Sequence, residues 1–294
     1  MITVSNLTKT FGAQTVVSDV SFMLEPNTAT ALIGPNGAGK TTTLSMLTGL
    51  LAPTSGTIEI AGVTDIRREI GFLPQYPQFY PWLTALEFTE MAAKLSGVPG
   101  PAVKKEAKRV LAFVGLEEAM KKKTATFSGG MKQRLGMAQA IVHKPKLLLL
   151  DEPVSALDPV GRREIMNLLK ELQQQTTILY STHILNDAEE MTDQLLFLRK
   201  GELVESGSLA EVRAKFESPR YRIEFASQED ALQFASQSEL SVTVNGTSVY
   251  VEIVEERPTM QQLLERLAAS KLAVTKVERV TASLEEIFME VAGQ

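Results

Sequence analysis

The chain has 294 residues and a formal net charge of −5, with 44% hydrophobic and 22% charged residues. This composition is typical of a soluble globular protein and excludes a disordered chain, a coiled coil and a collagen-like fibre. The negative balance gives no general attraction to nucleic acid or anionic lipid, and the absence of Cys excludes disulfides, Cys-based metal sites and thiol chemistry.

The N-terminal part is predicted to contain short strands, one glycine-rich loop and one helix. An apolar strand over Thr28–Ile33 leads directly into the glycine-rich segment Gly34–Thr41. The residues that follow are predicted to be helical until the region from Gly49 to Gly56. The other strands expected here are Ile2–Val4, Val16–Leu24, Thr57–Ala61 and Ile70–Leu73.

A helical insert is expected over about residues 76–127, where aromatic residues and prolines precede an amphipathic helical pattern. Within it, Lys104–Gly115 and Glu117–Lys123 are predicted to be helices. After the insert, strands that are apolar throughout alternate with helices, which indicates a mostly parallel sheet covered on both faces. These elements are Met131–His143 (helix), Lys146–Leu150 (strand), Val160–Gln174 (helix), Thr177–Ser181 (strand) and Ile184–Met191 (helix).

The C-terminal part is predicted to follow the order strand, helix, hairpin, helix, strand, helix. Asn245-Gly246 between two alternating runs places the turn of the hairpin. A β-α-β-β-α-β order is that of a small α+β ferredoxin-like domain. We therefore expect an α/β domain over residues 1–217 and an accessory domain over residues 218–294. The accessory elements are Tyr221–Phe225, Glu229–Gln237, Leu240–Val254, Thr259–Ala269, Val274–Val280 and Leu284–Val291.

The strongest chemical signal is the loop between the strand that ends at Ile33 and the following helix. Its glycines let consecutive backbone N–H groups turn toward phosphate oxygens, and the helix N-terminus favours negative charge. In this pattern Lys40 reaches the β- and γ-phosphates of a nucleotide, and the Thr41 hydroxyl holds Mg²⁺. The loop is Gly34-Pro35-Asn36-Gly37-Ala38-Gly39-Lys40-Thr41 and matches G-x-x-x-x-G-K-[ST].

Two carboxylates, Asp151 and Glu152, follow the apolar strand residues Leu147–Leu150. Ligands of open parallel sheets bind at the C-terminal ends of the strands. Asp151 fits the acidic group that orients Mg²⁺, and Glu152 could polarise an attacking water. His183 follows the next strand, Thr177–Ser181, and is expected at the same edge of the sheet.

Ser128-Gly129-Gly130 precedes a predicted helix, and serine is a favourable N-cap. The segment is either a plain helix start or a second anion site at a helix N-terminus. Since the chain already has one phosphate loop, the second interpretation suggests that two chains share a nucleotide.

Six motifs, in this order and spacing, resemble the nucleotide-binding subunit of ATP-binding cassette (ABC) transporters over about residues 1–215. The resemblance implies a P-loop ATPase core that uses ATP and Mg²⁺. It also implies that two such domains meet head to tail, with each ATP between the phosphate loop of one and Ser128–Gly130 of the other. The motifs are the phosphate loop, Gln75 in Phe72-Leu73-Pro74-Gln75, Ser128–Arg134, Leu147–Glu152, Ser155–Asp158 and Ser181–His183.

The resemblance implies a role for single residues. Phe11 is the aromatic that stacks on adenine, and Gln75 contacts Mg²⁺ and water and links the site to the membrane subunit. Glu152 is the general base, Asp158 is a dimer-interface aspartate, and His183 contacts the γ-phosphate.

The charge that develops during hydrolysis would be stabilised by Lys40, the backbone amides from Gly37 to Thr42 and Ser128 of the partner subunit. The chain departs from the most common family pattern at a few positions, and none of these removes a phosphate, metal or proton-transfer group. We therefore expect active ATP hydrolysis. The departures are Phe11, Phe127, Met131 and Val154.

The segment Phe127–Arg134, the short insert and Ser181–Leu185 resemble the ABC-2 branch, whose members are mostly exporters of drugs, lipids, peptides or polysaccharides. The implied partners are an ABC-2-type transmembrane permease and a second ATPase subunit, identical or different, with no nucleic acid. No apolar run is long enough to cross a bilayer. The chain is therefore expected at the cytoplasmic face of the cell membrane, held there by the permease.

Three alternatives stay open at this stage. A soluble ABC ATPase acting on the ribosome or DNA is disfavoured by the single phosphate loop, the absence of a long coiled coil and the acidic C-terminal part. The C-terminal domain has either an ordinary core or an added role in regulation or dimerisation. Aromatic and apolar residues of the insert either dock the permease or form the core of the insert: Tyr76, Phe79, Tyr80, Trp82 and Leu83.

Overall fold

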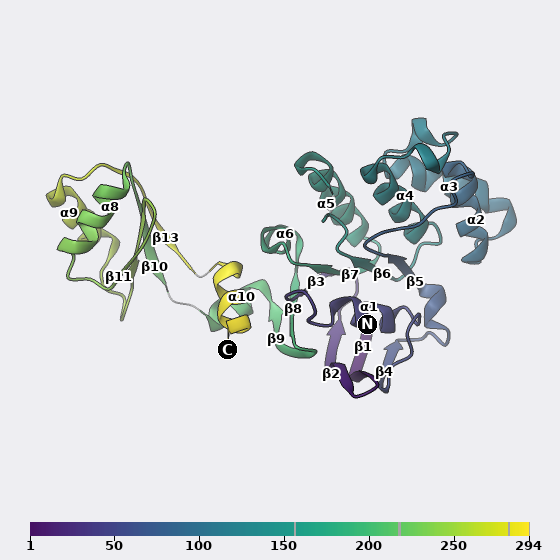
Figure 1. Cartoon of the computed structure of the whole chain (residues 1–294), viewed down its shortest axis with the longest axis horizontal. Coiled ribbons are helices and arrows are strands. Elements are labelled where there is room, and N and C mark those ends of the chain that lie inside the picture. Colours follow the sequence, from purple (N-terminus) through teal and green to yellow (C-terminus); the bar gives the residue numbers. More distant parts are fainter. Residues whose placement is uncertain (156, 217–218, 282, 294) are drawn as a thin grey trace. The chain divides into compact units, whose positions relative to one another are not determined.

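The computed structural model describes residues 1–155, 157–216, 219–281 and 283–293, which form two compact units. One unit comprises Met1–Leu209 with the residues from Val291 on, and the other comprises Ala210–Glu290 (Figure 1). The boundary expected between residues 217 and 218 lies outside the described residues, as does Ala156 of the Ser155–Asp158 motif.

A six-stranded sheet forms the centre of the first unit. Its strands are β3 (Ala29–Ile33), β5 (Ile70–Leu73), β6 (Leu147–Asp151), β7 (Thr177–Thr182), β8 (Gln194–Arg199) and β9 (Glu202–Ser208). They are ordered β5-β6-β7-β3-β8-β9, and all neighbours are parallel except β8 and β9. This arrangement confirms the mostly parallel sheet.

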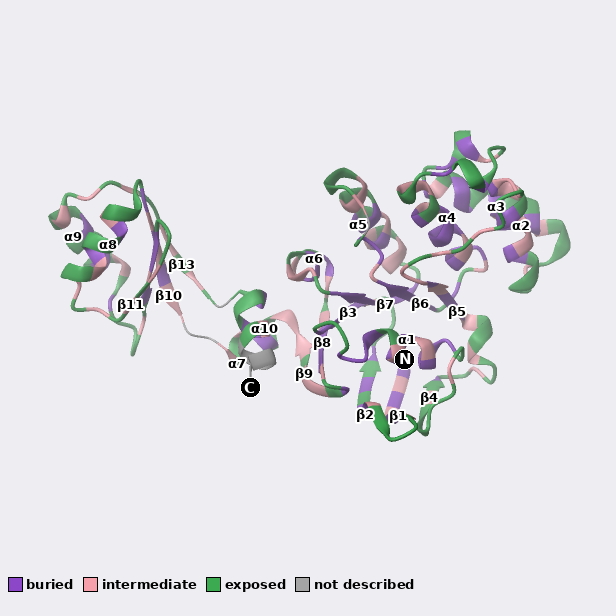
Figure 2. Ribbon diagram, viewed as in Figure 1, coloured by how far each residue is buried: buried purple, intermediate pink, exposed green. Residues whose placement is uncertain are grey.

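Helices cover both faces of this sheet. They are α1 (Lys40–Leu47), α4 (Gly129–Ile141), α5 (Pro159–Gln173) and α6 (Leu185–Met191). Figure 1 shows α1 on one face and α4, α5 and α6 on the other. Every residue of β3, β6 and β7 is buried (Figure 2), which explains why their sequences are apolar without alternation.

A three-stranded antiparallel sheet packs beside the larger one. Its strands are β1 (Ile2–Phe11), β2 (Gln14–Leu24) and β4 (Ser55–Ile60), in the order β2-β1-β4. The first strand is longer than the predicted Ile2–Val4, because β1 is the central strand and pairs on both sides. Leu7 of β1, Leu44 of α1 and Leu149 of β6 belong to one apolar cluster, so the two sheets share a core.

The helical insert consists mainly of α2 (Ala85–Leu95) and α3 (Gly100–Phe113). Thr84 and Glu87 form a capping box at the start of α2. The prediction of a helix over Glu117–Lys123 is wrong. Within this segment, Glu117–Ala119 forms one 3₁₀ turn. The carbonyl of Lys122 instead accepts a hydrogen bond from the N–H of Ala85 at 3.2 Å, so the chain leaves helical geometry to pair with the start of α2.

The second unit contains a four-stranded sheet with helices on one face. Its elements are β10 (Arg220–Phe225), α8 (Gln228–Gln237), β11 (Val242–Asn245), β12 (Ser248–Glu252), α9 (Met260–Ser270) and β13 (Val274–Val280). Before them comes α7 (Leu209–Lys215), of which Leu209 belongs to the first unit, and after them α10 (Leu284–Gly293), which belongs to this unit up to Glu290. The order β11-β12-β10-β13, antiparallel throughout, confirms the ferredoxin-like arrangement.

The core of the second unit lies between this sheet and its two helices. Ile223 of β10, Val249 of β12, Phe234 of α8 and Leu263 of α9 belong to one buried cluster. The hairpin turns as predicted, with Gly246 at φ +60°, a conformation that glycine adopts readily. Within the described parts of both units, no helix combines the length and the apolar character needed to span a membrane.

Candidate functional site

The glycine-rich loop joins the end of β3 to the start of α1. Gly37 and Gly39 have φ values of +80° and +103°, which L side chains rarely adopt. At Gly34 a Cβ atom would lie 2.3 Å from the carbonyl oxygen of Leu198, so only glycine fits beside β8. The first turn of α1 carries no acidic residue, which leaves its N-terminus free to attract an anion.

Lys40 lies buried beneath this loop. Its Nζ donates hydrogen bonds to the carbonyl oxygens of Gly34 at 2.7 Å and Pro35 at 3.2 Å. Burial lowers the pKa of the ammonium, and the carboxylates of Glu152 and Asp151 oppose that shift. The ammonium is therefore held at the loop with its charge poorly solvated, and an arriving phosphate would relieve this deficit.

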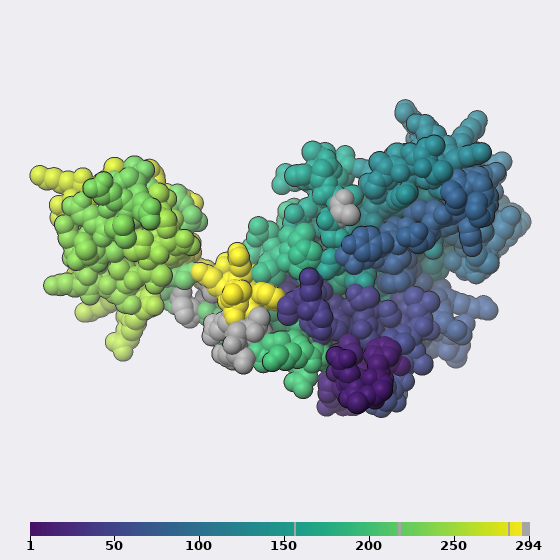
Figure 3. Space-filling view, viewed as in Figure 1, coloured from purple at the N-terminus to yellow at the C-terminus, as the bar shows by residue number. Residues whose placement is uncertain are grey.

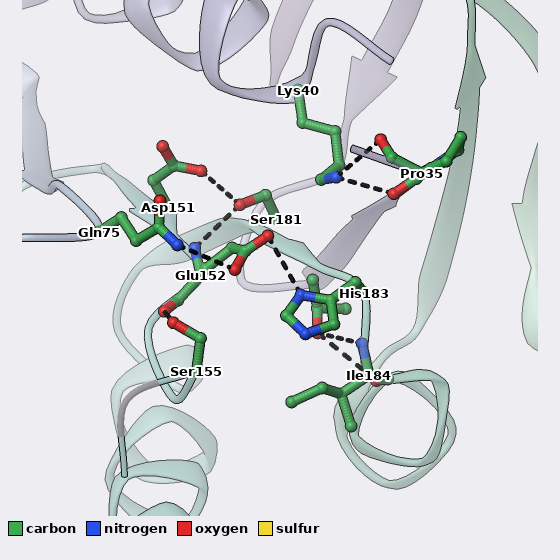
Figure 4. A network of polar contacts seen from close by, with 11 residues as sticks. Pro35, Lys40, Gln75, Asp151, Glu152, Ser155, Ser181, His183 and Ile184 are labelled. Carbon is green, nitrogen blue, oxygen red and sulfur yellow. Dashed lines mark hydrogen bonds and ion pairs between the residues drawn. The ribbon is translucent and has the colours of Figure 1, made fainter. Parts of the chain in front are cut away.

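The two predicted carboxylates occupy different environments at the end of β6. Asp151 is buried and accepts a hydrogen bond from Ser181 Oγ at 2.6 Å. Glu152 is partly exposed: its Oε1 lies 3.1 Å from Nδ1 of His183, and its Oε2 accepts from Nε2 of Gln75 at 3.2 Å (Figure 4). The Glu152 carboxylate thus contacts both Gln75 and His183, whereas the Asp151 carboxylate is buried in the sheet.

A cavity of about 580 Å³ opens between the loop and these side chains. Glu152, Gln75 and His183 line it opposite Lys40, so the structure brings together four residues predicted from separate motifs. From the loop and the start of α1, the lining residues are Asn36, Gly37, Gly39, Lys40, Thr41 and Thr42. Gly34, Pro35 and Ala38 belong to the same loop without lining the cavity.

Asp151 does not line this cavity, and neither do three further predicted groups. Ser128 is the N-cap of α4 and accepts from the N–H of Met131 at 3.3 Å, and Gly129 and Gly130 form the first turn of that helix. Asp158 caps α5 by accepting from the N–H of Gly161 at 3.1 Å. Phe11, at the end of β1, is half exposed.

Sequence reasoning missed residues that support the site from behind. Ser181 contacts both Asp151 and the backbone of Glu152, and Gln133 of α4 donates to the carbonyl of Pro153 at 2.8 Å. Ser181 belongs to the Ser181–His183 motif, and its position opposite Asp151 follows from aligning the parallel strands β6 and β7. Gln133 belongs to the Ser128–Arg134 motif, but no sequence pattern indicates its contact with Pro153.

A divalent cation fits the oxygen donors near the cavity. Thr41 offers a hydroxyl, Gln75 an amide oxygen and Asp151 a carboxylate, which are the hard ligands that Mg²⁺ prefers. In the described part of the chain, no three His, Cys, Asp or Glu residues gather in a way that could hold a metal alone. A metal here would therefore also need the oxygens of a bound phosphate and of water.

The comparisons with known proteins agree with this geometry. A family model described as "ABC transporter" matches residues 17–155, and one described as the C-terminal domain of DrrA1-3-like ATP-binding proteins matches residues 207–292. YxlF of Bacillus subtilis (strain 168), an uncharacterized ABC transporter ATP-binding protein, is 41% identical over 292 residues, which cover 99% of each chain. The chain belongs to the ATP-binding proteins of ABC transporters.

This ABC protein is also similar to the bacitracin transport ATP-binding protein BcrA of Bacillus licheniformis, at 42% identity over 214 residues that cover 70% of this chain and 69% of BcrA. A dimeric structure of the ATP-binding cassette MJ0796, in a post-hydrolysis state with ADP and Pi, has a TM-score of 0.65 and 30% identity, and covers 71% of this chain and 99% of that one.

These matches confirm that the ABC protein is an ATP-binding and ATP-hydrolysing transporter subunit. Subunits of this kind dimerise and work with a membrane permease. The alternative of an ATPase acting on the ribosome or DNA is not favoured, because the matching family and the relatives named here are transport proteins.

Proposed function

We propose that two ATPase subunits, each with this arrangement, close head to tail around two ATP molecules and drive an ABC-2-type permease that exports its cargo. The protein would then work at the cytoplasmic face of the cell membrane, held there by the permease. Each ATP would lie between the cavity of one subunit and Ser128–Gly130 of the other.

The observation that carries this proposal is the exposure of two predicted dimer-site residues outside the cavity. Ser128 and Asp158 are exposed N-caps of α4 and α5 and do not line the cavity of their own chain. They belong to one surface, since a Cβ atom at Gly130 would lie 3.6 Å from the Leu157 side chain. A second subunit bound over the cavity would supply such a surface to the ATP.

The residues around the cavity would divide the chemistry of hydrolysis. Glu152 would take a proton from the attacking water while Gln75 and His183 hold its carboxylate in place. Lys40 and the backbone amides from Gly37 to Thr42 would stabilise charge on the transferred phosphoryl group. Phe11, half exposed at the end of β1, would stack on adenine.

Mg²⁺ would be held by Thr41, Gln75 and Asp151 together with ATP. When bound, it would neutralise phosphate charge and favour in-line displacement at the γ-phosphate. Buried Asp151 would keep its carboxylate oriented through Ser181, while the more exposed Glu152 stays free to exchange a proton with water.

An apolar groove of about 550 Å³ between α2 and the edge of the sheet is a suitable dock for the permease. Leu50 and Leu95 belong to its lining and are 73% and 81% exposed. Figure 3 shows the insert (blue) along one side of the first unit. A contiguous exposed apolar patch commonly marks a partner surface, and we propose that this groove is one.

The aromatic residues of the insert divide between its core and its surface. Phe79 packs edge-to-face on Phe88 of α2, with 4.9 Å between ring centroids. Tyr76 and Trp82 remain 68% and 65% exposed. Tyr76 follows Gln75 directly in the chain, and we propose that both exposed side chains also contact the permease.

Replacing Trp82 with Ala is expected to weaken assembly with the permease by at least about tenfold, because buried aromatic anchors dominate interface energies. The affinity for ATP should stay unchanged, since Trp82 does not line the cavity. Co-purification with the permease and nucleotide binding would measure the two effects. Leu232→Ala, which truncates a 53% exposed side chain on α8, is the control. Full assembly of the Trp82 variant would remove Trp82 from the docking surface.

The similarity to a bacitracin transport protein leads us to propose peptide antibiotics as the cargo class. Disrupting the gene for this subunit is expected to lower the inhibitory concentration of such peptides. A wild-type copy should restore resistance, whereas a Glu152→Gln copy should not. Unchanged sensitivity across a panel of these peptides would argue against this cargo, and restoration by Glu152→Gln would argue against ATP-driven export.

A further inference from the structure

Ser181 lies at the end of β7, directly opposite Asp151 in the parallel pairing of β6 and β7. Its side chain is fully buried and does not line the cavity. The hydroxyl donates to Oδ1 of Asp151 at 2.6 Å and accepts from the backbone N–H of Glu152 at 2.9 Å (Figure 4). One hydroxyl therefore contacts both carboxylate residues of the site, one through its side chain and one through its backbone.

The backbone of Glu152 needs this support. Its φ is +47°, in the left-handed region that residues other than glycine rarely adopt. Such a conformation persists only where the surroundings fix it. Ser181 holds the N–H of Glu152, while the backbone N–H and the hydroxyl of Ser155 donate to its carbonyl oxygen at 3.3 and 3.2 Å. The peptide groups on both sides of Glu152 are thereby fixed.

Because of this backbone conformation, the side chains of Asp151 and Glu152 point to different places. Asp151 stays inside the sheet, and Glu152 reaches into the cavity to meet Gln75 and His183. Two adjacent carboxylates with different proposed tasks thus depend on the same buried hydroxyl for their separate positions.

We propose that Ser181 is a positioning residue for ATP hydrolysis, which sets the Asp151 carboxylate for Mg²⁺ and the Glu152 carboxylate for the attacking water. The inference rests on the functions proposed above for Asp151 and Glu152. Ser181 acts only through these two residues, since it is buried behind them and outside the cavity.

Ser181→Ala removes both hydrogen bonds while leaving the phosphate loop untouched. Loss of a partner that orients a metal ligand typically costs about 10-fold to 100-fold in metal affinity or activity. We expect kcat to fall by at least about tenfold, and the Mg²⁺ concentration for half-maximal rate to rise by a similar factor. ATP affinity measured without hydrolysis should stay close to wild type, because Lys40 and the loop amides are unchanged.

Two further variants separate positioning from packing. Ser181→Thr keeps the hydroxyl and should recover turnover and the Mg²⁺ requirement relative to Ser181→Ala. Thr176→Val removes another buried hydroxyl, which donates to the carbonyl of Pro145 at 2.7 Å at the opposite end of β7. Turnover of Thr176→Val should match wild type. Thermal unfolding of each protein shows whether it is folded under the assay conditions.

Turnover of a folded Ser181→Ala protein within about twofold of wild type would overturn the proposal, as would an unchanged Mg²⁺ requirement. Equal losses of turnover in Ser181→Ala and Thr176→Val would also overturn it, because the effect would then be one of packing. Glu152→Gln in the same assay separates this inference from the proposed function. If Glu152→Gln keeps its turnover, Glu152 is not the base and the proposed function is wrong. If Glu152→Gln loses turnover but Ser181→Ala keeps it, the positioning role of Ser181 alone is wrong.

Discussion

Replacing Glu152 with Gln is expected to abolish steady-state ATP hydrolysis while leaving ATP binding intact. The amide has the same shape and can still contact Gln75 and His183, but it cannot accept a proton from water. A positioned general base contributes about 10²-fold to 10⁴-fold to a rate, so phosphate release should fall by at least about 100-fold. Steady-state phosphate release by the purified protein with Mg-ATP measures this effect.

Glu171→Gln is the matched control for this variant, because Glu171 is an exposed residue of α5 that does not line the cavity. Its turnover should equal that of the wild type. If Glu152→Gln retains turnover within about tenfold of wild type, then Glu152 is not the base.

Replacing Lys40 with Ala is expected to remove most of the affinity for ATP. The ammonium is the buried cation of the phosphate loop, and it also holds the loop through its bonds to Gly34 and Pro35. Hydrogen bonds to charged groups contribute about 1.5–3 kcal/mol each. We therefore expect the Kd for ATP to rise roughly 100-fold, which is close to 3 kcal/mol. Calorimetric titration with ATP measures the change.

Lys170→Ala controls for the loss of a positive charge. Lys170 lies on α5 and forms an exposed ion pair with Glu190 at 2.9 Å, and exposed pairs contribute little to stability. Its ATP affinity should match that of the wild type. An unchanged ATP affinity in Lys40→Ala would mean that the nucleotide binds elsewhere, and the cavity would lose its assignment.

The centre of the fold could be predicted because local sequence and tertiary environment agree there. The strands Ala29–Ile33 and Leu147–Asp151 are buried on both faces, so short, mostly apolar runs bounded by turn residues indicate them. The phosphate loop could be predicted for a related reason. Its glycines are needed for backbone conformations and close approaches that other residues cannot make.

Elements at the edges of the fold were harder to predict, because pairing partners distant in sequence determine them. β9 is only partly buried and forms by pairing with β8. The glycine of Lys200-Gly201 is the sequence signal for the turn between β8 and β9. Both residues have positive φ, as in two-residue hairpin turns. After the 3₁₀ turn at Glu117–Ala119 the chain pairs with the start of α2 through Lys122 and Ala85, a contact that no local pattern contains.

The site was predicted where motifs supply groups that line the cavity, as with Lys40, Gln75, Glu152 and His183. Ser181 was missed because its role depends on the register of two strands, and strand register is not visible in a single segment. Ser128 and Asp158 lie outside the cavity of their own chain. Their proposed roles therefore depend on a second subunit and stay predictions.

The sharing of ATP between two subunits can be measured as the mass of the Glu152→Gln protein in size-exclusion chromatography with light scattering, with and without Mg-ATP. Without nucleotide, we expect a single chain of 32.2 kDa. With Mg-ATP we expect a stable particle of twice that mass, because ATP is held between two subunits and is not hydrolysed. A single-chain mass in a peak that contains bound ATP would contradict the sharing of ATP between two copies of this subunit.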